Sequence, residues 1–307
     1  MTEAPAARLG AVVGLFREIG DLKRVRTADA DGSMATRAFT RAWSALVDGA
    51  DPRQVADAEC AAAVAGARLA GIDAAVMVRI GLDAGAAVAV RRAAVDEVAG
   101  GLDDATVARL HTAGASMADA PESGASVPPG FVGALCVQPR AGATAPGRPR
   151  LVVEPPENHG EHFWAVAVYG ALLAAELGAE PEEAFLLGLA HHLHNAVLPD
   201  AGFAGETLLG EHLDGVVERL TAAELDTLPD PLADRLRTLL PARADADSPL
   251  GRAFHAADVL DRVLQVHHHA RAAAFTVRDA LVDLELVHVS PVSAYHDEVL
   301  AAAGLLP

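Results

Sequence analysis

Apolar residues recur at three- and four-residue spacing along most of this 307-residue chain, which is the pattern of amphipathic helices. Asp51-Pro52 marks the start of one such helix, with an aspartate N-cap and a proline at the first helical position, and Gly71 marks its end. The same pattern predicts further helices over 6–19, 33–48, 73–80, 84–99 and 103–113. Later in the chain it predicts helices over 160–177, 181–197, 206–223, 231–240, 249–275 and 291–304.

Residues 114–157 interrupt this pattern with eight prolines and several glycines. Such a composition is typical of an extended connection, and the apolar run at 131–137 predicts one short strand within it. We therefore expect an N-terminal helical domain at 1–113, a Pro/Gly-rich linker at 114–157 and a second helical domain at 158–307.

Composition favours the same fold class. Hydrophobic residues make up 51% of the chain and aromatic residues only 4%, so the core consists mainly of Ala, Leu and Val, which suits close-packed helices. The expected class is all-α. The only two cysteines, Cys60 and Cys136, argue against a disulfide framework and fit a reducing compartment. The sequence contains no recognisable targeting segment or membrane span, so we expect a soluble, cytoplasmic protein.

The net charge of −18 is concentrated in one half of the chain. Residues 1–150 carry 16 basic and 17 acidic side chains, whereas residues 151–307 carry 8 basic and 25 acidic ones. An acidic surface repels polyanions, so nucleic acid is not an expected partner. A small phosphorylated substrate is compatible with this charge only where a bound cation and local arginines reverse the potential. The sequence does not determine the oligomeric state, and a homo-oligomer is possible.

Twelve of the thirteen histidines lie beyond residue 158, and several stand beside acidic residues. His162 ends the run Pro-Glu-Asn-His-Gly-Glu-His (156–162), His191 and His192 form a doublet, and Asp258 lies in Ala-Ala-Asp-Val-Leu-Asp-Arg (256–262). Three helical segments thus each deliver imidazole or carboxylate groups, which is how a helical bundle builds a metal site in its core.

These three segments resemble the ordered motifs of HD-domain metal-dependent phosphohydrolases, in particular the branch that includes 5′-deoxynucleotidases. The matching residues are 156–162 with the following Phe-Trp-Ala-Val-Ala, 185–200 and 253–265, and the similarity covers about 150–275. The resemblance implies an HD-like helical domain that hydrolyses a small phosphomonoester such as a nucleotide. It also implies one divalent metal ion, held by His162, His191, His192 and Asp258.

Two positions depart from the family's pattern. His192 stands where the family has an aspartate, and Asn195 stands where it usually has a glutamate that assists the attacking water. A set of three histidines and one aspartate suits Zn, Fe, Co, Ni or Mn better than Mg, which prefers oxygen ligands. Asn195 can orient a water but cannot take its proton, and such general-base assistance is worth about 10²–10⁴-fold. Asp200, which matches the family's later acid, is the remaining acid/base candidate.

Two other interpretations stay open: an HD-derived binding or scaffold module without catalysis, and an iron-dependent oxygenase on the same fold. Each candidate ligand also has a plainer interpretation, such as an ion pair between Asp258 and Arg262 one turn later. His255 could support the site from behind the ligands or add an extra ligand, and His212 could supply a further ligand if the site held two metals. His194 and His267–His269 are expected to be solvated. Candidate phosphate contacts are Arg148 and Arg150. A basic cluster of the first half could meet the acidic C-terminal half, a partner or an anionic ligand, with a solvated face as the default expectation. Its residues are Arg17, Lys23, Arg24, Arg26, Arg37 and Arg41.

Overall fold

The computed structural model describes residues 3–28, 30–116, 127–147, 150–151, 154–271 and 301. These residues are almost entirely helical, and their only β-type pairings are isolated bridges. The all-α expectation is therefore confirmed. The helices are α1 (Glu3–Asp21), α2 (Met34–Val47), α3 (Pro52–Leu69), α4 (Ala74–Arg79), α5 (Ala84–Val98), α6 (Asp104–Ser116), α7 (Gly130–Val137), α8 (His159–Leu177), α9 (Pro181–Ala190), α10 (Gly202–Leu209), α11 (Leu213–Leu225), α12 (Asp230–Leu239) and α13 (Pro249–Arg271). Short 3₁₀ segments are η1 (Ala99–Gly101), η3 (Leu193–Ala196), η4 (Gly210–His212) and η5 (Leu240–Ala244).

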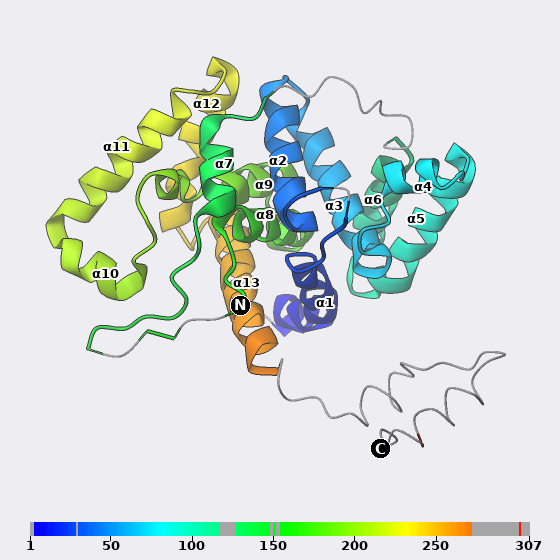
Figure 1. Cartoon of the computed structure of the whole chain (residues 1–307), viewed down its shortest axis with the longest axis horizontal. Coiled ribbons are helices and arrows are strands. Elements are labelled where there is room, and N and C mark those ends of the chain that lie inside the picture. Colours follow the sequence, from blue (N-terminus) through cyan, green and yellow to red (C-terminus); the bar gives the residue numbers. More distant parts are fainter. Residues whose placement is uncertain are drawn as a thin grey trace. The chain divides into compact units, whose positions relative to one another are not determined.

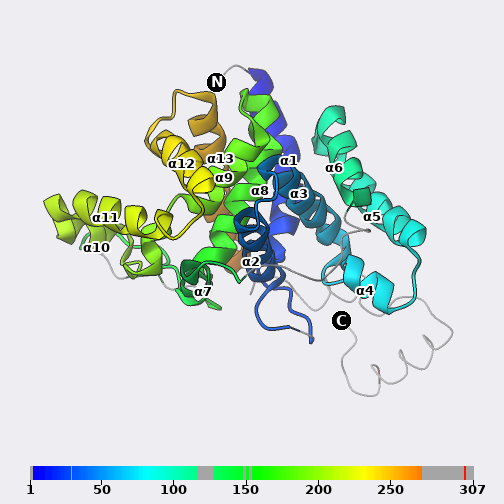
Figure 2. The same ribbon diagram turned by 90° about the horizontal axis from the view of Figure 1, so that it is seen from above.

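Helix α8 lies at the centre of the fold because it is apolar on all sides, which is typical of a buried helix. Every residue from His159 to Ala174 is buried. Its most extensive partner is α9, and α1, α2, α3 and α7 also pack on it. Figures 1 and 2 show α8 and α9 side by side, with α2 and α3 along them.

The hydrophobic core joins the two predicted halves of the chain. One cluster of buried side chains includes Phe16, Phe39 and Trp43 from the first half together with Phe163 and Phe185 from the second. The first of two compact units runs from Met1 to Leu264, so the division of the chain falls after Leu264 rather than within 114–157. The first half thus packs directly on the helices that carry the candidate site.

Three predicted elements differ from the structure. Residues 131–137 form helix α7 rather than a strand, because Phe131, Val132 and Leu135 are buried at helical spacing. The helix predicted over 181–197 ends at Ala190. The helix predicted over 206–223 is divided by Gly210, whose φ of 53° lies in the left-handed region. The helix predicted over 291–304 falls almost wholly outside the described residues.

The close approach of α8 and α9 depends on a glycine. A Cβ atom added at Gly188 would lie 2.4 Å from Ala167 Cα and 2.5 Å from Ala167 N, inside the contact distance of backbone atoms. We expect Gly188→Ala to lower the free energy of unfolding by about 1–3 kcal/mol, because the two helices must separate. Urea denaturation measures this loss. Gly170→Ala is the matched control at the same helix pair, where the nearest atom would be Ala184 O at 3.4 Å, and a control that destabilised equally would contradict the argument.

Candidate metal centre

His162 enters the site from the first turns of α8. Asn158 caps this helix in a capping box, in which its side chain accepts from Glu161 N and the Glu161 carboxylate accepts from Asn158 N. Ser33 Oγ, at the start of α2, donates to the same carboxylate at 2.6 Å. The cap therefore fixes the first turn of α8 against the N-terminal half, and His162 is fully buried beneath it.

His191 lies where α9 ends, and its own helix orients the ring. Its Nδ1 lies 2.7 Å from Gly188 O, and a carbonyl oxygen can only accept, so Nδ1 carries the hydrogen. The lone pair of neutral His191 is therefore on Nε2. Burial, helped by the neighbouring His162, lowers the pKa of His191 to about 3, so the ring is neutral at ordinary pH.

Asp258 completes the group from α13. Its Oδ1 lies 3.4 Å from His162 Nε2, and its Oδ2 lies 3.0 Å from the guanidinium of Arg262. Burial opposes ionisation of this carboxyl, but His162 and His191 in their protonated forms, together with Arg262, lower the pKa of Asp258 below its usual value. The ion pair with Arg262 that the sequence suggested is present, and it leaves Oδ1 facing the histidines.

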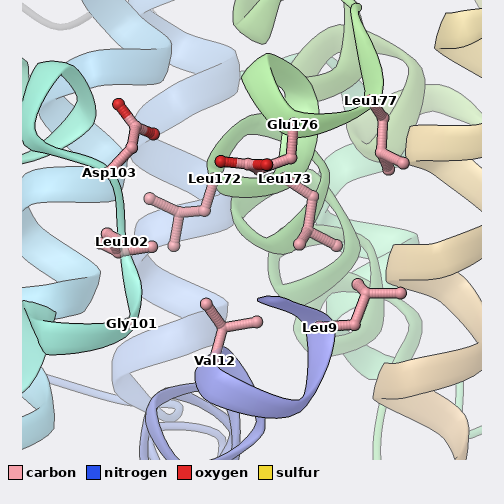
Figure 3. Close-up of a pocket in the computed structure, with 9 residues that line it drawn as sticks. All are labelled: Leu9, Val12, Gly101, Leu102, Asp103, Leu172, Leu173, Glu176 and Leu177. Carbon is pink, nitrogen blue, oxygen red and sulfur yellow. The ribbon is translucent and has the colours of Figure 1, made fainter. Parts of the chain in front are cut away.

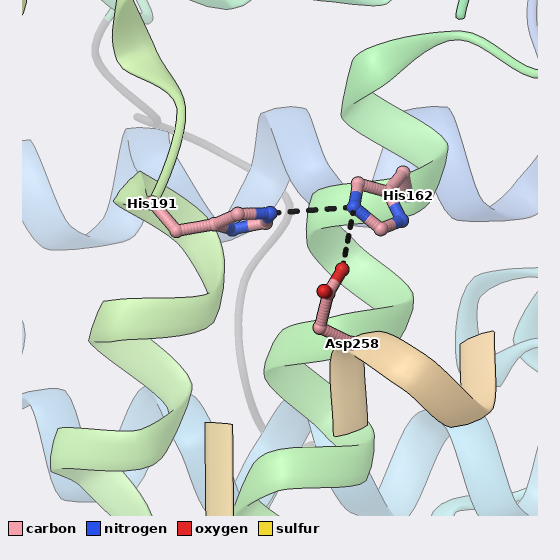
Figure 4. Close-up of side chains that lie close together, drawn as sticks. All are labelled: His162, His191 and Asp258. Carbon is pink, nitrogen blue, oxygen red and sulfur yellow. Dashed lines mark hydrogen bonds and ion pairs between the residues drawn. The ribbon is translucent and has the colours of Figure 1, made fainter. Parts of the chain in front are cut away.

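Figure 4 shows His162 linked to both His191 and Asp258 by dashed lines. The two Nε2 atoms lie 3.3 Å apart, and one ligand atom from each of the three residues lies within 4.8 Å of the others. His162 Nδ1 lies 2.7 Å from Asp261 Oδ2 and donates to it, so the lone pair of neutral His162 also lies on Nε2. Two lone pairs and a carboxylate oxygen thus converge, and they repel one another unless a cation or a proton lies between them.

This arrangement fits a divalent metal ion. Metal-bound histidines usually donate their second ring N–H to a carboxylate or a backbone carbonyl, as His162 does to Asp261 and His191 does to Gly188. The competing arrangement is an imidazolium at His162 between the two aspartates. In the first arrangement a metal ion lies between the ligand atoms, and in the second a proton does. A metal titration distinguishes the two.

A second acidic group adjoins the first. Glu157, His162 and Asp261 also offer ligand atoms within 4.8 Å of one another, but the ammonium of Lys23 contacts both carboxylates there. Burial alone would lower the pKa of Lys23, whereas the charges of Asp261 and Glu157 outweigh it and raise the pKa. The default expectation of a solvated face is wrong for Lys23, which is only 4% exposed. Lys23 instead meets carboxylates of the acidic C-terminal half, the other contact that the sequence left open.

His192, the fourth ligand implied by the resemblance, lies beside this group without belonging to it. The backbone of His192 leaves the helical region, with φ −135° and ψ 45°, so the doublet does not follow helical geometry. Its ring centroid lies 4.6 Å from that of His191, and its buried Nδ1 has no hydrogen-bond partner among the described residues. The structure therefore brings together three of the four implied ligands.

Asn195 and Asp200 both have structural contacts. The Asn195 side-chain amide donates to Leu198 O at 3.0 Å. Asp200 accepts from Ala141 N at 2.9 Å and from Gly202 N at 2.8 Å, and its Oδ2 lies 4.0 Å from His159 Nε2. Asp200 thus reaches the region of the site through His159.

The remaining predicted residues lie outside the group. His194 was expected to be solvated, but it is 5% exposed, because the end of α9 turns its side chain inward, and that expectation is wrong. His255 is partly buried against Phe254, and His212 is exposed on η4. His267 is exposed as expected, while His268 and His269 are partly buried. Arg150 points toward the carbonyls of Ala141 and Ala201, and Arg148 lies outside the described residues.

His159 is a buried residue of the site that the sequence did not single out. It is 2% exposed, and both of its ring nitrogens lack a hydrogen-bond partner among the described residues. Its ring stacks on Phe163, whose ring centroid also lies within 6.4 Å of the rings of His162, His191 and His192. The sequence signal for His159 was its position three residues before His162, because residues three apart lie on the same face of a helix.

A separate pocket lies at the other end of α8 (Figure 3). Its lining is mainly aliphatic, with Leu9 and Val12 of α1 facing Leu172 and Leu173 of α8. These α8 residues follow His162 by ten positions or more, which corresponds to about 15 Å along a helix. The pocket is therefore distinct from the candidate metal centre, and its apolar lining favours helix packing.

Searches against protein-family models, curated proteins and solved structures find no match to this chain. None of the described helices combines the length and the apolar character that a membrane crossing requires.

Proposed function

We propose that this protein is a metal-dependent phosphohydrolase that acts on a small phosphomonoester such as a nucleotide. The observation that carries the proposal is the convergence of His162 Nε2, His191 Nε2 and Asp258 Oδ1, with both imidazoles oriented by donation from Nδ1. The resemblance of the three sequence motifs supplies the reaction class.

The ligand set favours particular metals. Two imidazole nitrogens and one carboxylate oxygen suit Zn, Fe, Co, Ni or Mn, whereas Mg prefers oxygen ligands. When bound, such an ion polarises a phosphoryl oxygen and activates water. His162, His191 and Asp258 would hold it, and Asp261 and the Gly188 carbonyl would keep the two rings in the required orientation.

Asp200 is proposed as the acid/base residue, and His159, whose Nε2 lies 4.0 Å from Asp200 Oδ2, lies beside it. Asn195 is held to Leu198 O and has no proton-accepting group, so it does not replace the family's glutamate. His159 lies between Asp200 and the face of α8 that carries His162, and burial, with the charge of Arg140, lowers the pKa of His159 to about 2. The neutral ring can accept a hydrogen bond from a water at the site.

Local positive charge supports an anionic substrate in this acidic half of the chain. Arg243 donates to His191 O at 2.8 Å, and Arg140 lies near Glu157 with its Nε 3.8 Å from the carboxylate. Beyond the effect of burial, the charge of Arg140 lowers the pKa of His159 and that of Arg243 lowers the pKa of His194, so both guanidinium groups lie close to buried imidazoles. With a metal ion, they would offset the acidic surface near a phosphate group.

A second candidate is an iron-dependent oxygenase. The specific observation in its favour is the number and type of converging ligands, because two histidines and one carboxylate are the facial set of non-haem iron oxygenases. His192, which would add a third imidazole, stands outside the group.

Metal analysis of untagged protein tests both candidates. We expect about one transition-metal ion per chain, and release of phosphate from nucleoside monophosphates by the loaded protein. Bound iron with oxygen consumption and no phosphate release would favour the oxygenase. Protein that takes up no metal, even after incubation with Zn²⁺ or Mn²⁺, would overturn both and favour a binding module.

A further inference from the structure

Lys23 places a positive charge inside the cluster of metal-binding groups. It follows α1 in the chain and is buried, and its Nζ lies 2.5 Å from Glu157 Oε1 and also contacts Asp261 Oδ1. The partners are 134 and 238 residues away in sequence. The lysine therefore joins the N-terminal half to both the start of α8 and helix α13.

The ammonium lies where a metal ion would otherwise be held. Glu157 and Asp261 offer carboxylate oxygens, and with His162 Nδ1 they form a group whose ligand atoms all lie within 4.8 Å of one another. Two buried carboxylates in contact need a cation between them, since buried charges without a partner are costly. Here the chain supplies that cation itself.

The position of Lys23 also determines which nitrogen of His162 is free. Asp261 is held by Lys23 through Oδ1 and accepts from His162 Nδ1 through Oδ2. His162 Nε2 is thereby left with its lone pair toward His191 and Asp258.

We propose that Lys23 is a built-in counter-cation that closes the Glu157–Asp261 group to metal and so confines the chain to one ion, held by His162, His191 and Asp258. This deepens the proposed function and rests on it for the identity of the single site. It also gives the N-terminal half a role, because the site is incomplete without the residue that follows α1.

Counting bound Mn²⁺ in Lys23→Met and in the unaltered protein tests the proposal. Mn²⁺ accepts both oxygen and nitrogen ligands, and its free concentration is measured by electron paramagnetic resonance. We expect Lys23→Met to bind about one more ion per chain than the unaltered protein, because methionine has a similar length and no charge. Equal counts would overturn the role of Lys23. If the unaltered protein binds no Mn²⁺ ion and the variant binds one, the proposed site at His162, His191 and Asp258 is overturned. The role of Lys23 in excluding metal from Glu157 and Asp261 would then still stand.

Arg68→Met is the matched control. Arg68 also pairs with two carboxylates from different helices, Glu18 and Glu97, but all three groups are partly exposed. Its replacement should leave the Mn²⁺ count unchanged, and a gain of one ion there would show that any unpaired acidic pair suffices.

Folding of the variant is itself informative. Circular dichroism and thermal unfolding, with and without Mn²⁺, are measured for Lys23→Met beside each Mn²⁺ count. The same measurements are made for Lys23→Gln, whose side-chain amide can still donate to one carboxylate. We expect Mn²⁺ to raise the melting temperature of both variants more than that of the unaltered protein. Variants that stay unfolded even with Mn²⁺ would contradict the proposal, because the added ion should replace the ammonium.

Discussion

His191→Ala is expected to lower the affinity for Zn²⁺ by more than about 100-fold and to abolish phosphate release. Changes to residues that merely orient a metal ligand cost about 10–100-fold in affinity, so removing a ligand itself should cost more. Among the residues that the structure describes, His191 provides one of three converging ligand atoms, and its orientation is already fixed by donation to Gly188 O. Isothermal titration calorimetry of metal-free protein gives the affinity, and a phosphate assay gives the activity.

His194→Ala is the control for this substitution. His194 lies three residues later, is also buried, and is not one of the three converging residues. Its loss removes a comparable volume from the same segment. We expect its Zn²⁺ affinity to stay within about tenfold of the unaltered protein. Equal losses in the two variants would mean that the region simply collapses, and the assignment of His191 as a ligand would be wrong.

The helices could largely be predicted because their signals are local. Asp51 with Pro52 starts α3, and Asn158 with Glu161 caps α8, each within four residues of sequence. The wrong strand at 131–137 arose where a short apolar run has no such signal. The end of α9 at Ala190 was missed because the following residues are held by tertiary contacts, such as that of Arg243 with His191 O.

The candidate site was predictable only where its residues carry a motif. His162, His191 and Asp258 have such motifs, and the structure brings them together. Asp261 was present in the third motif, but nothing local shows that it faces His162 rather than solvent.

For the basic cluster that includes Lys23, the sequence left contact with the acidic C-terminal half open, but it could not assign Lys23 to particular carboxylates. Its two partners are more than 130 residues away, and a single lysine in a basic segment suggests a solvated face. The expected division into two domains reinforced this error, since it separated Lys23 from the helices on which it packs. The packing of α1, α2 and α3 against α8 brings it there.

The metal-free protein is expected to lose stability steeply as the pH falls below about 6.5. Burial, with smaller effects from nearby charges, lowers the pKa of His159 to about 2, of His191 to about 3 and of His194 to about 4, and it lowers the pKa of His192 as well. In the unfolded chain each of these groups titrates near about 6.5. Between these values the unfolded state binds more protons, so stability is fully present above about pH 6.5 and is lost as the pH falls toward the folded-state pKa.

The size of this effect follows from the number of groups. Each imidazole that stays neutral in the fold lowers the free energy of unfolding by about 1.4 kcal/mol for each pH unit below the pKa of the unfolded chain. Four such groups give about 5 kcal/mol per pH unit, which is comparable with the total stability of many domains, about 5–15 kcal/mol. We therefore expect metal-free protein to unfold between about pH 6 and pH 4, before Asp258 and Asp261 are protonated.

Urea denaturation of chelator-treated protein at several pH values measures this slope. Replacing one buried imidazole, as in His194→Gln, should reduce it by about one quarter, since one of four protonations is removed. Replacing the exposed His212 should leave it unchanged. Zn²⁺ should shift the transition to lower pH, because an ion that binds only the folded state opposes protonation of its ligands. A stability that stays constant from about pH 7.5 to pH 5.5 would show that the fold accepts protons at these imidazoles.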